Sequence, residues 1–536
     1  MATYDLIIRD ADLIDGTGAP TRRTDLAVSG DRIAEIGRIA PSLGHRVIEA
    51  AGLTLSPGFV DIHSHSDYHL LLQPTADSAV RQGVTLEIGG NCGYAAAPIW
   101  GPWLEERAAM YRDLYGLDHA WQGVADYFAR LEATGISENF GLLMGHNTLR
   151  GSAMGGADRP PLPEELEAMI DGAREGMRDG ALGVSTGLVY APACFSKPEE
   201  LIPIACAVRE AGGILTCHMR SEGDGLIEAI EEIIGVAEKA NIPLQISHLK
   251  TSGERNWPKL HEALRRIEEA RARGLDVSCD RYPYIASNTG LQAVLPNWAL
   301  EGGQQERTER LRNAATRARM TAEITTHYSA DYWSRLLISE VTREENRRYE
   351  GLRVVEAAKL AKALPVDFVL ELLLTEQMQV DAIFFTMCEE NLDTILAQPY
   401  AMIGSDSGCR GHEGPLSHGR PHPRTFGTFP RVLGHFVREK RLLDLPTAVR
   451  KMTWDPCRKL GLLDRGHLQP GCVADLVLFD SATVSDRATY ETPIQYPIGI
   501  HHVFVNGVLV VEAGEHTGAR PGHIVRRAYP EFRWDW

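Results

Sequence analysis

A pair of histidines, His63 and His65, follows a short apolar run that starts at a Pro57-Gly58 turn. If this run is a strand, alternate side chains share a face, so the two imidazoles lie side by side at its end. Two imidazoles in that position can bind one divalent metal ion. The pair alone is weak evidence, because a chain with 19 histidines should hold roughly 0.7 such His-x-His pairs by chance. It gains weight only if other parts of the chain supply further ligands.

Further candidate ligands stand at the carboxyl ends of other apolar segments, and they are Cys92, His218, His248 and Asp406. The parallel strands of an α/β barrel bring their carboxyl ends to one rim, where the active sites of barrel enzymes lie. A single histidine at a strand end is more often structural than functional. Five strand ends that carry His, Cys or Asp favour one shared metal site instead.

Cys92 and Asp406 differ from the histidines in the chemistry that they offer. Buried cysteine is often only a small hydrophobic residue. Cys92, however, lies in the segment Gly89–Gly93, which holds more glycines than a segment that only packs in the core would need. Thiolate sulfur binds zinc well and can be shared between two metal positions. Asp406 is the candidate general base, since a carboxylate beside a metal-activated water can take its proton and pass it to a leaving group. The alternative for Asp406 is an ordinary turn or helix-cap residue.

Residues 57–465 supply the elements that must position these side chains. Apolar strands alternate there with amphipathic helices, which is the pattern of repeated βα units around a parallel sheet. The helix expected after Pro163 carries its apolar residues on one stripe, at Leu166, Met169, Ile170, Ala173 and Met177. We therefore predict an α/β fold, a (β/α)8 TIM-like barrel over residues 57–465.

Two other regions have a different texture. Residues 290–350 are rich in Arg, Glu and Gln and predict an inserted helical subdomain near the barrel mouth. This insertion is either a solvated decoration or a lid over the substrate. Residues 1–56 and 466–536 contain short apolar strands with turn signals such as Asn506-Gly507. We expect the two chain ends to pair into one small β-sandwich domain.

The charge balance and the cysteines restrict the partners and the setting. The net charge of −17 argues against nucleic acid and anionic membranes, because phosphate binding needs a basic surface. A small anionic substrate would need Arg or Lys within the site. The nine cysteines form no C-x-x-C pair, which indicates reduced thiols and a cytoplasmic protein. The first residues lack a signal-peptide pattern, and no run of about 18 apolar residues predicts a membrane span.

Several segments of the chain carry motifs that occur together, and they are Gly58–His65, Gly89–Gly93, Thr216–Arg220, Ile246–Lys250, Asp280–Tyr284, Ile403–Asp406, Arg420–Arg424, Met452–Pro456 and Asp464–Gly471. Together they resemble the D-aminoacylase (N-acyl-D-amino-acid deacylase) branch of the amidohydrolase superfamily. The resemblance runs nearly end to end, and as a combination these motifs are highly specific for the branch.

The resemblance implies zinc-dependent hydrolysis of the amide bond of N-acyl-D-amino acids, giving a carboxylate and a free D-amino acid. It places a tightly bound zinc on Cys92, His218 and His248, with Cys92 in place of the carboxylated lysine of many relatives. A second, weaker metal position would use His63, His65 and Asp406, and Asp406 would be the catalytic base. The residues expected to bind the substrate are Lys250, Arg424, Tyr282, Tyr284 and Tyr190.

Two departures from the family pattern affect the expected substrate rather than the reaction. The segment between Asp406 and Arg424 is long and carries His412 and His418 near the mouth, and Asn147 stands where a small residue is common. Two alternatives remain open at this point. The chain could act on another C–N bond, such as that of an N-substituted formamide or a cyclic amide. It could also be a non-catalytic scaffold, although a scaffold would be expected to have lost metal ligands.

Overall fold

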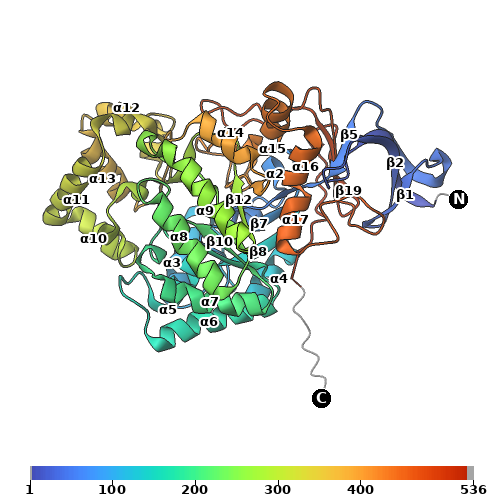
Figure 1. Ribbon diagram of the computed structural model, residues 1–536. Coiled ribbons are helices and arrows are strands. Elements are labelled where there is room, and N and C mark those ends of the chain that lie inside the picture. The colour runs from blue at the N-terminus through green and yellow to red at the C-terminus, as the bar shows by residue number, and fades with distance from the viewer. Residues whose placement is uncertain (1–2, 528–536) are drawn as a thin grey trace, which may run out of the picture.

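The computed structural model describes residues 3–527 and has an eight-stranded parallel barrel at its centre (Figure 1). The strands follow one another around the sheet in chain order, and the carboxyl ends of the first and last strands are joined by a bridge between Ser64 and Ser407. The predicted TIM-like barrel is confirmed. Its strands are β6 (Phe59–Asp61), β7 (Val84–Gly89), β8 (Asn139–Gly145), β9 (Gly183–Gly187), β10 (Ile214–His218), β11 (Leu244–Ile246), β12 (Val277–Arg281) and β16 (Ala401–Ile403).

Helices surround the barrel and bury their apolar stripes against it. In α6 (Pro163–Arg178), Met169, Ala173 and Met177 are buried, as the spacing of apolar residues predicts. Pro163 occupies the first turn, where its missing N–H costs nothing, and Gly180 follows the helix with a φ of 107° that suits glycine. The other outer helices include α4 (Val124–Thr134), α5 (His146–Met154), α7 (Pro198–Glu210), α8 (Leu226–Ala240), α9 (Leu260–Ala272), α14 (Glu389–Ala397), α16 (Leu445–Met452) and α17 (Trp454–Leu460).

The two ends of the chain build a separate β-domain beside the barrel (Figure 1). One continuous sheet of nine strands forms, because β5 pairs antiparallel with β17 and so joins the N-terminal strands to the C-terminal ones. Residues 1–2 and 528–536 of the predicted sandwich lie outside the described residues. The strands are β1 (Tyr4–Leu13), β2 (Arg22–Ser29), β3 (Arg32–Gly37), β4 (Gly44–Glu49), β5 (Thr54–Pro57), β17 (Leu476–Phe479), β18 (Ile500–Val505), β19 (Val508–Glu512) and β20 (Glu515–His516).

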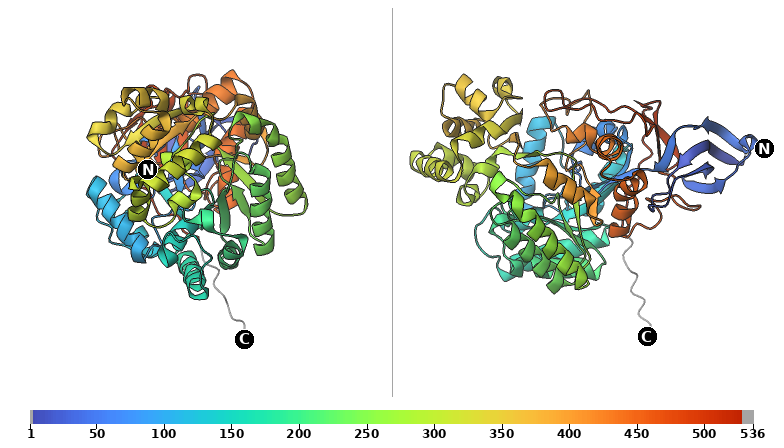
Figure 2. Two further views of the ribbon diagram at one scale, coloured as in Figure 1. Left: turned by 90° about the vertical axis from the view of Figure 1, so that its left-hand side faces the viewer. Right: turned by 45° about the horizontal axis from the view of Figure 1, so that its top comes forward.

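A third unit is inserted between the last two barrel strands, β12 and β16, and lies on the side of the barrel away from the β-domain (Figures 1 and 2). It includes the predicted segment 290–350 but begins before it and continues beyond it. It holds a small antiparallel sheet as well as helices. Its elements are β13 (Ser287–Gly290), α10 (Gln304–Arg312), α11 (Ala314–His327), β14 (Leu336–Val341), α12 (Val354–Leu360), α13 (Pro365–Thr375) and β15 (Val380–Phe384).

No helix within residues 3–527 combines the length and the apolar character that a membrane crossing requires.

Candidate metal centre and substrate site

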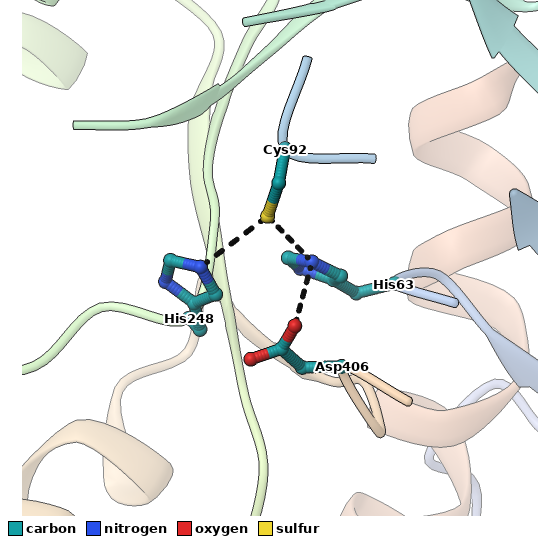
Figure 3. A group of neighbouring side chains, drawn as sticks. All are labelled: His63, Cys92, His248 and Asp406. Carbon is teal, nitrogen blue, oxygen red and sulfur yellow. Dashed lines mark hydrogen bonds and ion pairs between the residues drawn. The ribbon is translucent and has the colours of Figure 1, made fainter. Parts of the chain in front are cut away.

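Four buried side chains, each following a different barrel strand, meet at the carboxyl-terminal rim of the barrel (Figure 3). The sulfur of Cys92 lies 3.3 Å from Nε2 of His63 and 3.5 Å from Nε2 of His248. Nε2 of His63 lies 3.4 Å from Oδ1 of Asp406. One donor atom of each residue falls within 4.8 Å of every other, which is close enough for one ion to contact all four.

The two remaining predicted ligands lie at opposite edges of this group. Nδ1 of His218 is 2.8 Å from Nε2 of His248, and Nε2 of His65 is 3.0 Å from Oδ1 of Asp406. A second group of possible donors is formed by His218, His248 and Glu222. All six candidate ligands of the sequence therefore come together at one place, and Glu222 joins them.

The chemistry of these donors fits zinc, which binds thiolate, imidazole and carboxylate groups. Burial raises the pKa of the Cys92 thiol, but positive charge on His63 and His248 outweighs this and holds the pKa well below its usual range. Cys92 is therefore a thiolate, the form that binds metal. When the imidazoles are neutral, which is the form that binds metal, the thiolate and carboxylates leave an excess of negative charge that a divalent cation would balance.

Asp406 is ionised although it is buried. Burial raises its pKa, but Arg424, His248 and His63 together hold the pKa well below the ordinary value. Its two oxygens have different partners: Oδ1 accepts from His65, whereas Oδ2 accepts from Nη1 of Arg424 at 2.7 Å. The carboxylate is therefore held in a fixed orientation, as a proton-transfer group requires.

The backbone is strained at three of the candidate ligands. Cys92, His248 and Asp406 have φ angles of 53°, 37° and 54°, in the left-handed region that side-chain-bearing residues rarely adopt. Each such residue costs on the order of 1–3 kcal/mol and persists only where the surroundings impose it, which is common at functional sites. The strain turns these side chains toward the centre of the barrel mouth.

Asp280, on β12, is a site residue that the sequence analysis did not single out. Its Oδ1 accepts hydrogen bonds from Nδ1 of His63 and from the backbone N–H of His248, both at 2.9 Å. Its Oδ2 accepts from Nε2 of Gln245 at 2.7 Å. The carboxylate thus fixes the ring of one candidate ligand and the backbone of another. The sequence signal that could have identified Asp280 was its position near the end of a predicted barrel strand.

Glu222 is the second residue that the sequence analysis missed. Its Oε1 lies 2.9 Å from Nδ1 of His248 and 2.5 Å from Nζ of Lys250. Its other oxygen lies 3.7 Å from Nε2 of His218. The predicted substrate cation Lys250 is therefore paired with a carboxylate next to the candidate ligands. The only sequence signal is an acidic residue in the loop after the strand that ends in His218.

The three predicted substrate tyrosines occupy different surroundings. The Tyr190 ring packs on His218, and its hydroxyl is hydrogen-bonded to Oγ1 of Thr289 at 2.9 Å. Tyr282 is buried, with the guanidinium groups of Arg281 and Arg424 over its ring at 4.1 and 4.6 Å. Among residues 3–527, no hydrogen-bond partner lies near the Tyr282 hydroxyl.

Tyr284 faces away from the candidate ligands. Its hydroxyl is 3.5 Å from the Pro423 carbonyl and 3.5 Å from the Asp486 carboxylate, at the border with the C-terminal segment. It does not line either of the two cavities beside the candidate ligands. Tyr282 does not line these cavities either, so Tyr190 is the one of the three that borders the open space, and Tyr282 contacts it only through Arg424.

Two cavities open beside the candidate ligands. One, of about 450 Å³, is lined by His65, Cys92 and Arg424. The other, of about 730 Å³, is lined by His218, His248 and Lys250. Four residues line both cavities, and these are Tyr190, Asn288, Thr289 and Asp406. The hydrogen bond between Tyr190 and Thr289 on β13 lies at this shared border, so the inserted unit contributes to the walls of both cavities.

The two departures from the family pattern have separate places. His418 lies 3.1 Å from Glu340, which lines the first cavity, whereas His412 stacks on Tyr496 away from it. Asn147 is buried beneath the site and is hydrogen-bonded to both the N–H and the carbonyl of Gly187. It therefore fixes the loop that carries Tyr190.

Known proteins resemble this chain over nearly its full length. The model of the Amidohydrolase family matches residues 46–511. The chain is 37% identical to D-aminoacylase of Alcaligenes xylosoxydans xylosoxydans, over 98% of this chain and 98% of that protein. It is 35% identical to N-acyl-D-glutamate deacylase of the same organism, over 98% of this chain and 99% of that protein. A crystal structure of N-acyl-D-glutamate deacylase from Bordetella bronchiseptica, complexed with zinc and a phosphonate mimic of the tetrahedral intermediate, superimposes with a TM-score of 0.84. That protein is 34% identical over 98% of this chain and 100% of its own. The chain belongs to the amidohydrolase family.

Proposed function

We propose that this protein hydrolyses the amide bond of N-acyl-D-amino acids in a zinc-dependent reaction, giving a carboxylate and a free D-amino acid. The observation that carries the proposal is the ionised, oriented Asp406 carboxylate within a buried cluster of imidazole and thiolate donors. Near-complete alignment with a D-aminoacylase and an N-acyl-D-glutamate deacylase supports the choice of substrate.

Cys92, His218 and His248 would hold the tightly bound zinc, and His63, His65 and Asp406 would hold a second, weaker ion. Bound zinc would supply Lewis-acid chemistry at the acyl carbonyl and lower the pKa of the attacking water. The thiolate form of Cys92 and the fixed ring of His63 prepare the chain for this role.

Asp406 is the group that moves the proton. As an ionised carboxylate it accepts a proton from the attacking water and then donates it to the departing amine. Arg424 binds Oδ2 and stabilises the negative charge of the carboxylate. Oδ1, which lies beside His65, is the oxygen left for this proton exchange. Because both histidine and arginine contacts fix the carboxylate, it needs no reorientation between the two steps.

Two cations would bind the substrate carboxylate. Lys250 and Arg424 are both nearly fully buried and border the two cavities beside Asp406, Lys250 on one and Arg424 on the other. A guanidinium offers a planar pair of donors, which suits a carboxylate. Tyr190 lines both cavities, and Tyr282 packs against the Arg424 guanidinium from behind. These local cations would let a chain of net charge −17 accept an anionic substrate.

The proposal extends to the setting of the protein. All nine cysteines lie within residues 3–527, and none of them forms a disulfide there. Reduced thiols are usual in the cytosol, which supports a cytoplasmic location.

The test of the function is a substrate screen with and without added zinc. We expect N-acetyl-D-amino acids to be hydrolysed far faster than the matched L compounds, and chelation of zinc to abolish the activity. Preference for N-substituted formamides or cyclic amides would contradict the proposed substrate class. No hydrolysis of any of them by zinc-loaded protein would favour a non-catalytic scaffold.

The test of the mechanism is the Asp406→Asn variant. We expect kcat to fall about 10²- to 10⁴-fold, the usual contribution of a positioned acid–base group, while the tight zinc stays bound. Asp171→Asn is the control, because Asp171 lies exposed on α6. A kcat near that of the wild type in the zinc-bound Asp406→Asn variant would remove Asp406 from the role.

A further inference from the structure

The far wall of the first cavity carries two arginines that the proposed mechanism does not use. Arg107 lies on α3 (Gly101–Tyr115), outside the barrel strands, and Arg307 lies on α10 of the inserted unit. Both line the cavity that also contacts Cys92 and Asp406, so one continuous space joins them to the candidate metal ligands. They come from segments about two hundred residues apart, which the fold brings to one wall.

These two arginines have no acidic partner. Within residues 3–527, no carboxylate oxygen lies within 4.0 Å of either guanidinium, as shown by their absence from the ion pairs of that region. Arg410 and Arg424, the other arginines of this cavity, are paired with Glu340 and Asp406 at 2.5 and 2.7 Å. Among the described arginines that line this cavity, Arg107 and Arg307 are therefore the two without an acidic partner.

The donors of both arginines are only partly used. Arg107 has its guanidinium carbon 5.4 and 5.5 Å from the ring centroids of Tyr94 and Trp103, and its Nη1 meets only the sulfur of Met110, at 3.9 Å. Nε of Arg307 donates to the Gly302 carbonyl at 2.9 Å. Among residues 3–527, Nη2 of Arg307 is buried and has no hydrogen-bond partner. Such a group is costly to leave unpaired, and an anion in the cavity would satisfy it.

The carboxylates that line the cavity have partners other than these two arginines. Glu106, on the same wall, accepts a hydrogen bond from the backbone N–H of Gln304 at 3.4 Å, at the start of α10. Glu340 is paired with Arg410 and His418, and Asp406 with Arg424. Asp381 also lines the cavity, and although burial raises its pKa to about 6 it stays mostly ionised at neutral pH; the arginines that act on it are Arg410 and Arg424.

The wall lies next to the loop that carries the candidate ligand Cys92. Tyr94, which packs against Arg107, is two residues from Cys92 in the loop after β7. Contact of Glu106 with the start of α10 brings α3 and α10 together, so that both arginines face the same space. A cavity of about 450 Å³ is of the size that encloses small-molecule ligands.

We propose that Arg107 and Arg307 bind a second carboxylate of the substrate, so that the preferred substrates are N-acyl-D-amino acids with two negative charges. This inference rests on the proposed function. The second carboxylate can come from the side chain, as in D-glutamate or D-aspartate, or from the end of the acyl group, as in a succinyl amide. In both cases the recognised chemistry is a carboxylate that binds to Arg107 and Arg307 in the cavity lined by Asp406.

The experiment compares charged substrates with neutral ones of matched shape. The pairs are N-acetyl-D-glutamate with N-acetyl-D-glutamine, and N-succinyl-D-leucine with N-butyryl-D-leucine, measured on the zinc-loaded enzyme. We expect kcat/KM to be about 10- to 100-fold higher for the charged member of at least one pair, in line with a charge-assisted hydrogen bond. The pair that shows this preference identifies the source of the second carboxylate.

Arg107→Gln and Arg307→Gln should each reduce this preference, and the double variant should abolish it while the neutral substrates keep their kcat/KM. Arg112→Gln on α3 and Arg312→Gln on α10 are the controls, because both side chains are exposed on the same helices. No preference for charged substrates in the wild type, or an equal loss for charged and neutral substrates in the variants, would overturn the proposal.

Binding separates a failure of this inference from a failure of the proposed function. If the wild type hydrolyses none of these compounds, the deacylase function fails. Titration calorimetry with N-acetyl-D-glutamate and N-succinyl-D-leucine then tests the arginines alone. Weaker binding of either compound by the double variant than by the controls would support the anion site, and equal binding would overturn it.

Discussion

Replacing Asp280 by Asn tests whether this buried carboxylate organises the candidate metal centre. Asp280 is fully buried, and its two oxygens accept three hydrogen bonds, from His63, the His248 backbone and Gln245. Because an ionised carboxylate only accepts, the contact places a proton on Nδ1 of His63 and directs Nε2 toward Cys92. Asn keeps the shape but offers one oxygen and one amide nitrogen.

The expected loss in the free energy of unfolding follows from the three hydrogen bonds of Asp280. If the Asn oxygen stays with His63 and the His248 backbone, its NH2 group faces the NH2 group of Gln245. One buried hydrogen bond is then lost with its donors unpaired, which costs about 1–3 kcal/mol. The two contacts that remain lose their charge assistance, about 1 kcal/mol each, and loss of the buried charge offsets part of the sum. We expect the free energy of unfolding to fall by about 3 kcal/mol.

The effect on metal binding should be separate from the effect on folding. A residue that orients a metal-binding histidine usually contributes about 10- to 100-fold to metal affinity. The assay is zinc affinity by competition with a chromophoric chelator, together with urea unfolding of the zinc-free protein. Asp171→Asn, on the exposed face of α6, is the control and should change neither quantity measurably. Unaltered zinc affinity in a folded Asp280→Asn variant would refute the orienting role, and an unfolding free energy within about 0.5 kcal/mol of the wild type would refute the hydrogen-bond argument.

Two further predictions concern groups away from the candidate ligands. Burial and the neighbouring Glu87 raise the pKa of Glu138 well above its ordinary value of 4.5, so unfolding at higher pH releases a proton. The free energy of unfolding should therefore fall as pH rises above about 4.5, by up to about 1.4 kcal/mol per pH unit until the folded pKa is reached. Glu138→Gln should flatten the slope of Tm against pH above about pH 4.5, and an unchanged slope would contradict this. Asn147→Ala should loosen the loop that carries Tyr190 by removing the hydrogen bonds to Gly187, and raise KM more than it lowers kcat. A KM equal to that of the wild type would show that the loop holds without Asn147.

The sequence by itself predicts the barrel and the rim at which the candidate ligands meet. Alternating strands and helices leave few topologies, and the parallel barrel is the one confirmed. Because the carboxyl ends of its strands converge, His63, Cys92, His218, His248 and Asp406 come together although they span most of the chain. Side-chain type and strand position are local properties, so they can be read without coordinates.

Only the tertiary structure decides which other side chains reach that rim and how the space beside it is divided. Asp280 and Glu222 are ordinary acidic residues in the sequence, and their contacts with His63 and Lys250 depend on side-chain direction. Tyr282 and Tyr284 look alike in the sequence, yet only Tyr282 packs against Arg424.

The wall that carries Arg107 and Arg307 depends on the fold in the same way. It forms because α3 and the inserted α10 pack together, and the extent of that inserted unit is set by the pairing of β13 with β15. This pairing joins segments that are far apart in the chain. Its energy comes from long-range contacts, which a local sequence pattern cannot predict.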